Sequence, residues 1–192
     1  MPALTTPAPT TPAPTVLKIA YLSLGSNIGD REPHLQSAVS RLEAAGRVLA
    51  VSSIYETEPV EFTRQPWFLN CAVALETSCT PRQLMSAILQ IEEDMGRRRV
   101  QDKGPRSIDI DILLFADEIV NSEGLTIPHP SMAARRFVLE PMAEIAPQAR
   151  HPVLNQTVLQ LRDALPAGQV ARRISRESLP DAERRFGQQN GE

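Results

Sequence analysis

Two aspartates, Asp109 and Asp111, interrupt the most apolar run of the sequence, GPRSIDIDILLF at 104–115. The surrounding isoleucines and leucines predict a β-strand over 107–115, and residues two apart on a strand face the same way. Their Cα atoms would lie about 6.6 Å apart, so both carboxylates can reach one divalent cation or two neighbouring ones. Oxygen donors in this number suit Mg²⁺, which completes its shell with water and phosphate oxygens. The pair therefore predicts a magnesium site.

A basic segment directly precedes this strand and favours the metal-binding interpretation. Although the chain has a formal net charge of −3, this segment carries Arg97, Arg98, Arg99, Lys103 and Arg106. Guanidinium groups bind phosphate through paired hydrogen bonds, and lysine acts as a point charge. Carboxylates for Mg²⁺ beside cations for phosphate predict phosphoryl transfer, which depends on positioning and charge neutralisation. The alternatives are a solvated basic loop and aspartates that pair with arginine on a solvated face.

A further candidate site lies on the strand predicted for WFLNCAVALET at 67–77, where Phe68 and Asn70 share a face. An aromatic ring and an amide suit a flat, polar heterocycle, which stacks on the ring and hydrogen-bonds at its edge. The alternative places Phe68 in the core and Asn70 against a neighbouring turn. His129, in LTIPHPSMAARRF, is by itself more typical of a structural histidine than of a catalytic one.

The elements that would position these side chains follow the order βαββαβ. Alternating and β-branched residues predict strands over 17–25, 47–59, 67–77 and 107–115. Helices are predicted after the first and the third of these strands. The order is typical of an α+β, ferredoxin-like fold with an antiparallel sheet and helices packed on one face. Additional helices are expected in the C-terminal part.

The helix boundaries are predicted from capping residues. The first helix would begin at Asp30 as N-cap and end at Gly46 as the C′ residue. The second would begin with a capping box formed by Thr80 and Gln83, and end at Gly96. The later elements are a short strand near 118–120 and helices from Ser131 and over 157–165.

Composition limits the class of protein. The chain has 192 residues, 42% of them hydrophobic, which predicts one globular domain over 16–165. The proline- and threonine-rich residues 1–15 are expected to be a disordered leader, and 166–192 a charged tail or helix. Cys71 and Cys79 provide no disulfide framework, which favours the cytoplasm. The acidic charge and the lack of an apolar run of about 20 residues predict no nucleic-acid or membrane partner, and we expect a monomer.

As a set, several segments resemble the 6-hydroxymethyl-7,8-dihydropterin pyrophosphokinases of folate biosynthesis. The resemblance covers about 19–152 and is carried by LSLGSNIGD, SSIYETEPV, QPWFLNCAVALET, GPRSIDIDILLF and LTIPHPSMAARRFVLEPMAEIAP. It implies an enzyme that transfers a pyrophosphoryl group from ATP to the hydroxymethyl oxygen of the pterin and releases AMP. ATP and the pterin would be its small-molecule partners, and Mg²⁺ its cofactor.

The resemblance also implies roles for individual residues. Asp109 and Asp111 would hold two Mg²⁺ ions, while Arg97 and Arg106 would stabilise the triphosphate as catalytic residues. The implied ATP contacts are Glu92, Arg99, Lys103, Ile112, Leu125, Thr126, His129 and Arg135. The implied pterin contacts are Thr57, Val60, Phe68, Asn70 and Phe137. Two loops, 60–65 and 97–104, would close over the substrates.

Four positions depart from the family pattern. Lys103 stands where some members carry a tryptophan that helps to close the loop, and Phe68 where many have a tyrosine. Glu58 replaces a residue that is often small or proline, and Gly124 stands where some members have an arginine. Two other functions stay open on the residues alone: a nucleotidyl- or glycosyltransferase that uses the same D-x-D pair, and a non-catalytic module that binds a ligand through the same face.

Overall fold

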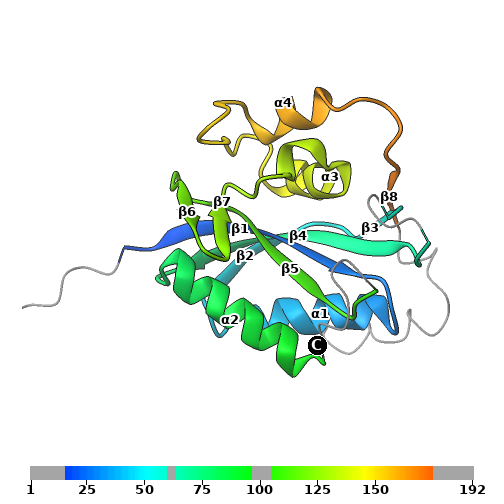
Figure 1. The fold of residues 1–192 in the computed structure, drawn as a ribbon, viewed down its shortest axis with the longest axis horizontal. Helices are drawn as coiled ribbons and strands as arrows, with labels where there is room; N and C mark the ends of the chain where they lie inside the picture. Colours follow the sequence, from blue (N-terminus) through cyan, green and yellow to red (C-terminus); the bar gives the residue numbers. More distant parts are fainter. Residues whose placement is uncertain (1–15, 60–63, 97–104, 175–192) are drawn as a thin grey trace, which may run out of the picture.

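One antiparallel sheet forms the centre of the computed structural model, which describes residues 16–59, 64–96 and 105–174 (Figure 1). Its strands lie in the order β5-β1-β4-β3-β8, and β2 pairs with β4 beside β3. The bounds are β1 Lys18–Ser26, β2 Arg47–Val51, β3 Tyr55–Thr57, β4 Phe68–Thr77, β5 Asp109–Phe115 and β8 Ala171–Arg173. Helices follow β1 and β4, and the chain order matches the predicted βαββαβ once β2 and β3 are taken together as the strand predicted over 47–59, so the ferredoxin-like α+β fold is confirmed.

Two helices, α1 (Arg31–Leu42) and α2 (Pro81–Asp94), cover one face of the sheet, the lower face in Figure 1. The predicted capping box of α2 is present: the Thr80 hydroxyl accepts a hydrogen bond from the Gln83 amide, and the Gln83 side chain accepts one from the Thr80 amide. Gly96 follows α2 with a φ of 79°, the left-handed conformation expected of a C′ glycine.

Gly46 does not have the predicted role. Helix α1 ends at Leu42 with Glu43 as its C-cap, and Gly46 lies outside the left-handed region. A side chain at Gly46 would collide with the backbone oxygen of Glu76 on β4, so this glycine permits close approach to the neighbouring strand. The strand predicted over 47–59 is also divided, because residues 52–54 separate β2 from β3.

A second layer covers the opposite face, whereas the ferredoxin-like pattern alone predicts helices on one face. This layer contains a 3₁₀ turn η1 (Met132–Ala134), α3 (Arg136–Ile145) and α4 (Val158–Asp163), and it lies above the sheet in Figure 1. Its apolar residues pack on Ala72, Leu113 and Leu114 of the sheet. The short strand expected near 118–120 is one arm of a hairpin formed by β6 (Val120–Ser122) and β7 (Leu125–Ile127).

The segment after residue 165 contributes to the sheet. A tail or helix is predicted there, but Ala171–Arg173 form β8, which pairs with β3 in antiparallel register. The predicted leader, 1–15, and residues 175–192 lie outside the described residues. In the described part of the chain, every helix is too short or too polar to cross a membrane.

Candidate active site

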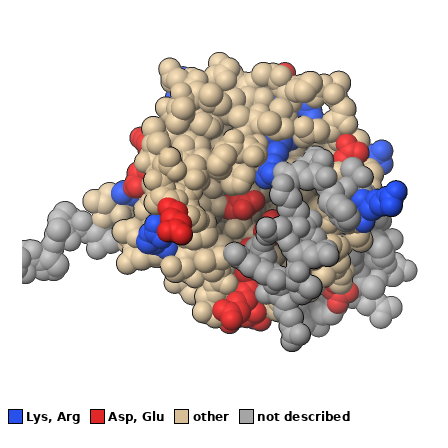
Figure 2. Space-filling model, viewed as in Figure 1, with Lys and Arg blue, Asp and Glu red and all other residues tan. Residues whose placement is uncertain are grey.

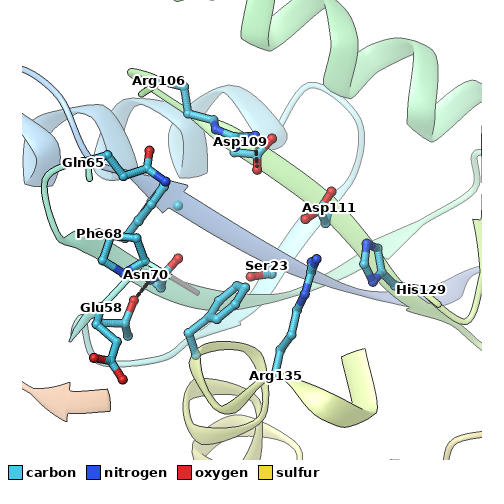
Figure 3. A pocket seen from close by; sticks show the side chains of 14 residues that line it. Ser23, Glu58, Gln65, Phe68, Asn70, Arg106, Asp109, Asp111, His129 and Arg135 are labelled. Atoms are coloured by element: carbon cyan, nitrogen blue, oxygen red, sulfur yellow. Dashed lines mark hydrogen bonds and ion pairs between the residues drawn. The ribbon is translucent and has the colours of Figure 1, made fainter. Parts of the chain in front are cut away.

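A cavity of about 280 Å³ lies on the α3 side of the sheet, where β1, β4 and β5 meet the start of α3 (Figure 3). Its lining residues are Ser23, Gly25, Thr57, Glu58, Pro59, Gln65, Phe68, Asn70, Arg106, Asp109, Asp111, His129, Arg135 and Phe137. In Figure 2 acidic and basic side chains meet near the centre of the face shown, whereas the surface above them carries few charged groups. Residues from four separate strands and from α3 therefore converge on one cavity with both polar and apolar lining.

The predicted parity of β5 is confirmed. Asp109 and Asp111 both line the cavity, whereas Ile110 and Ile112 are buried in the core formed with α1 and α2. Across the ladder, Asp109 pairs with Gly25 and Asp111 with Ser23 on β1. The small side chains on β1 leave the space above the two carboxylates open.

An irregularity follows the aspartates on β5. Leu22 pairs with Ile112, but Tyr21 pairs with Leu114, so Leu113 is an additional residue on β5. Leu113 and Leu114 both pack against the α3 layer as a result. The carbonyl oxygen of Leu113 accepts a hydrogen bond of 2.9 Å from the backbone amide of His129.

Electrostatics distinguish the two carboxylates. Burial and the nearby charge of Asp109 raise the pKa of Asp111 to about 7, although the Arg135 guanidinium opposes the shift. Asp109 instead forms an ion pair with Arg106, with 2.9 Å between Oδ2 and Nη1. Figure 3 shows Arg135 reaching from the start of α3 toward Asp111 on the opposite wall. The deeper carboxylate is therefore the one whose charge the ligand-free protein stabilises least.

These carboxylates fit a divalent cation. A cation between them would offset the burial and the repulsion from Asp109 that raise the pKa of Asp111, and both carboxylates supply the hard oxygens that Mg²⁺ prefers. Within residues 16–59, 64–96 and 105–174, no group of three or more His, Cys, Asp or Glu side chains is arranged to hold a metal ion. A two-carboxylate site suits Mg²⁺ because this ion fills its remaining positions with water and phosphate oxygens.

The other end of the cavity carries the amide and the aromatic rings. Asn70 is 3% exposed, and its Nδ2 donates a hydrogen bond of 2.7 Å to the Thr57 hydroxyl. A Cβ on Gly25 would lie 2.7 Å from Asn70 Oδ1, so only glycine leaves this oxygen room. Phe68 and Phe137 also line the cavity. The predicted aromatic and amide pair is thus part of the cavity wall, not of the core.

The start of α3 and the segment before it supply two more predicted residues, His129 and Arg135. Both line the cavity, and the Arg135 guanidinium lies 5.6 Å from the centre of the Phe137 ring. Burial and the Arg135 charge lower the pKa of His129, while Asp109 opposes the shift, so the imidazole is neutral at pH 7. A neutral imidazole can accept as well as donate a hydrogen bond.

Four other predicted ATP contacts do not line this cavity. Glu92 is buried and its carboxylate accepts a hydrogen bond from the Ile110 amide, and the Ile112 side chain lies in the core. The Ile110 amide points away from β1, toward Glu92. Backbone groups two residues apart on a strand point to the same side, so those of Ile112 lie at the same edge of β5. Leu125 is buried and Thr126 is exposed on β7. Their contacts stay predictions. Val60, Arg97, Arg99 and Lys103 lie outside the described residues.

Five lining residues were not predicted as ligand contacts. Ser23 and Gly25 could have been found from parity on β1, where they occupy alternate positions of an apolar strand. Glu58, Pro59 and Gln65 lie in connections, which have no such periodicity.

Asn27 is a second feature that the sequence does not reveal. It is 1% exposed, and its Oδ1 accepts a hydrogen bond of 2.8 Å from the Arg106 amide. Its Nδ2 donates to Gln65 Oε1 at 3.0 Å and to the Pro66 carbonyl at 3.2 Å. One side chain therefore joins the segments that precede β4 and β5, both of which carry cavity residues.

Comparisons with known proteins show the family of the chain. A sequence model of the 7,8-dihydro-6-hydroxymethylpterin-pyrophosphokinase (HPPK) family matches residues 21–147. The chain belongs to the HPPK family. It is 52% identical over 132 residues to a 2-amino-4-hydroxy-6-hydroxymethyldihydropteridine pyrophosphokinase from Bacillus subtilis. The aligned residues cover 68% of this chain and 79% of that protein.

Other relatives are longer. The chain is 46% identical over 152 residues to the folic acid synthesis protein fol1 of Schizosaccharomyces pombe, and spans 78% of its own length but only 21% of that protein. A crystal structure of Plasmodium falciparum HPPK-DHPS with pterin has a TM-score of 0.63 at 19% identity, over 79% of this chain and 45% of that one. The likeness to this crystal structure supports the fold alone.

The HPPK match includes all of the cavity. Its lining residues run from Ser23 to Phe137, inside the matched range of 21–147. Helix α4 and strand β8 lie beyond that range. Contacts made by this later segment are therefore additional to the part of the chain by which HPPK proteins are recognised.

Proposed function

We propose that this HPPK family member catalyses Mg²⁺-dependent transfer of the pyrophosphoryl group of ATP to the hydroxymethyl oxygen of 6-hydroxymethyl-7,8-dihydropterin, releasing AMP, in folate biosynthesis. The observation that supports this most strongly is one cavity with two chemically different ends. Phe68 and Asn70 lie at one end, and Asp109 and Asp111 at the other. Such a site suits the joining of a flat heterocycle to a polyphosphate.

At the pterin end, hydrogen-bonding roles follow from the contacts already made. Asn70 Nδ2 donates one of its two N–H groups to the Thr57 hydroxyl, and Asn70 Oδ1 is the group that would accept from N–H groups of the ring edge. The Thr57 hydroxyl accepts from Asn70 and keeps its own proton to donate to a ring acceptor. Phe68 and Phe137 would stack on the two faces of the ring.

At the phosphate end, Asp109 and Asp111 would hold the metal, for which we expect two ions. Mg²⁺ bound there would reduce the repulsion between the attacking oxygen and the phosphate oxygens. Arg106 and Arg135 would bind and orient phosphate oxygens through paired hydrogen bonds. His129, neutral at pH 7, would contribute a hydrogen bond without adding charge.

The transfer itself exchanges one P–O bond for another. The hydroxymethyl oxygen attacks the β-phosphorus, and the bond from that phosphorus to the oxygen of the α-phosphate breaks. AMP leaves with the bonding electrons, and Arg106 and Arg135 would stabilise the charge that develops on it. We assign the hydroxyl proton to Asp109, whose carboxylate lies within the cavity. Closing the site would exclude water, because hydrolysis of ATP is the competing reaction.

The remaining roles belong to this proposal. Arg97, Arg99 and Lys103 would contact the triphosphate, and Val60 the pterin. Glu92, Leu125 and Thr126, with the backbone of Ile112, would surround the nucleotide at the edge of β5. We further propose a cytoplasmic monomer, which sedimentation and fractionation would test.

Product analysis provides the decisive experiment. The purified protein is incubated with ATP, Mg²⁺ and the reduced hydroxymethyl pterin, and nucleotides are separated by chromatography. We expect AMP and a doubly phosphorylated pterin in equal amounts, both abolished by a chelator and by omission of the pterin. ADP with a singly phosphorylated pterin, or no consumption of ATP, would contradict the proposal.

A further inference from the structure

A short segment after α4 contacts two walls of the cavity. Residues 168–174, here called the C-terminal strap, include β8 and lie outside the residues that match the HPPK family. Gly168 has a φ of 126°, which favours glycine and lets the chain turn toward the sheet. In Figure 1 the strap descends from the α3–α4 layer to the edge of β3.

Gln169 forms two hydrogen bonds with the backbone at the start of α3. Its Oε1 accepts a hydrogen bond of 2.8 Å from the Arg136 amide, and its Nε2 donates one of 2.9 Å to the Ala134 carbonyl. The N-cap residue of α3 is Arg135, whose side chain forms no cap hydrogen bond. Helix N-terminal amides need an acceptor, and here a glutamine from a distant segment supplies it. The two bonds flank Arg135 and stand one residue before Phe137.

The same strap is attached to the opposite wall. The Val170 amide donates a hydrogen bond of 3.0 Å to Glu58 Oε1. Ala171 pairs with Thr57, and the Ile174 amide donates to the Ile54 carbonyl at 3.0 Å. The strap therefore connects the wall that carries Thr57 and Glu58 to the wall that carries Phe137.

We propose that Gln169 is a positioning residue that sets the gap between these walls, and so the fit of the pterin ring. The inference rests on the proposed function. Ring stacking requires a nearly fixed separation between Phe68 and Phe137, because dispersion falls steeply with small gaps. Arg135 has a long, jointed side chain and can accommodate a small shift of its backbone. Pterin binding should thus depend on Gln169 more than ATP binding does.

The fold itself does not require this residue. Helix α3 is held by Val138, Leu139 and Met142, which are 0–2% exposed. Gln169 is only half-buried, and hydrogen bonds at such positions contribute little to the stability of a whole domain. Removing its side chain should therefore loosen the first turn of α3 without unfolding the domain.

The experiment compares three variants of the full chain with the wild type. Gln169→Ala removes both hydrogen bonds. Gln169→Glu keeps an acceptor for the Arg136 amide but loses the donor to Ala134. Gln148→Ala is the matched control, because Gln148 is an exposed glutamine beyond the other end of α3.

Steady-state kinetics and direct pterin titration with a non-hydrolysable ATP analogue are measured for each. For Gln169→Ala we expect the KM and the Kd for the pterin to rise about tenfold, equivalent to about 1.4 kcal/mol. The kcat and the KM for ATP should change less than threefold, and Gln169→Glu should be intermediate. Hydrogen exchange at the Arg136 amide should accelerate in Gln169→Ala and stay unchanged in Gln148→Ala.

An unchanged pterin Kd in Gln169→Ala, or equal effects in Gln148→Ala, would overturn the inference. So would a fall in Tm without any change in pterin affinity. A wild type that binds the pterin but forms no AMP would refute the proposed function alone, since the Kd comparison still tests Gln169. A wild type that does not bind the pterin would overturn both.

Discussion

The guanidinium of Arg106 lies 2.9 Å from the carboxylate of Asp109, so a side chain assigned to phosphate is held by one assigned to metal. Both are partly buried, with 20% and 24% of their side chains exposed. Under the proposed function, both must exchange partners when Mg²⁺ and ATP bind. The ion pair thus offsets the charge of Asp109 in the ligand-free site and competes with the ligands.

This competition predicts opposite effects of Arg106→Ala on metal binding and on turnover. Without the Arg106 guanidinium, less positive charge offsets the repulsion between Asp109 and Asp111, so Mg²⁺ alone should bind several-fold more tightly. The kcat should fall about a hundredfold or more because a phosphate ligand is lost. Calorimetric titration with Mg²⁺ and steady-state assays would measure the two effects. Arg41→Ala, which removes a surface ion pair with Asp94, is the control; weaker Mg²⁺ binding in Arg106→Ala would contradict the prediction.

Asp111→Asn should separate activity from stability. We expect kcat to fall at least about a thousandfold, about 4 kcal/mol of barrier, with the fold intact. The folded-state pKa of Asp111, about 7, lies above its ordinary value of 3.8, so the folded protein retains a proton that the unfolded chain releases. The wild type should therefore lose stability as pH rises from about 4 to about 7.

The variant should lack this pH-dependent loss. Its Tm relative to the wild type should rise across that interval and level off above it, measured without metal. A Tm difference that stays constant with pH would show that folding does not raise the pKa of the Asp111 carboxyl.

Gly25→Ala should weaken pterin binding through Asn70. The new methyl group would lie 2.7 Å from Asn70 Oδ1 and 3.6 Å from the Phe68 ring, so the amide must move. We expect at least a tenfold rise in the pterin Kd and little change for ATP. In Asn70→Ala the contact is absent, so adding Gly25→Ala there should cost much less. Additive losses in this double-mutant cycle would disprove the coupling.

Glu144 provides a pH-dependent contact of the opposite sign. Burial raises its pKa, but hydrogen bonds from Ser53 and Tyr55 and the charge of Arg173 outweigh this and hold the pKa below its ordinary value. Stability from such a group is present above the unfolded pKa and is lost as pH falls through the folded one. Glu144→Gln should lower stability by about 1 kcal/mol at pH 7, because the site is largely solvent-screened.

The loss should disappear in acid. Denaturant titrations of wild type and Glu144→Gln at pH 7 and near pH 3 would show converging unfolding free energies. Curves that stay parallel would mean that the hydrogen bonds do not depend on the ionised carboxylate.

Much of the site was predictable where it depends on strand parity. Asp109 and Asp111, like Phe68 and Asn70, share faces because residues two apart on a strand must. The capping box of Thr80 and Gln83 is equally local. These features need no knowledge of the neighbours.

Features that depend on distant contacts were not predictable. Gly46 reads as a helix end, yet its role comes from the approach of Glu76 on another strand. Strand β8 is short and partly basic, and only pairing with β3 makes it a strand. Gln169 gives no signal in its own segment, since the amide that it caps lies 33 residues earlier in the chain.

The additional residue on β5, Leu113, is an irregularity in the pairing of β1 and β5 that contributes to the site. Leu113 has no pairing partner on β1, so its carbonyl is available to the His129 amide. This hydrogen bond holds the segment that carries His129 beside β5. Deleting Leu113 would restore regular pairing between β1 and β5. It would also remove the carbonyl that holds the His129 backbone, and with it the position of the imidazole. Under the proposed function, a more regular sheet would lower activity here, so this irregularity should be kept when the protein is engineered for stability.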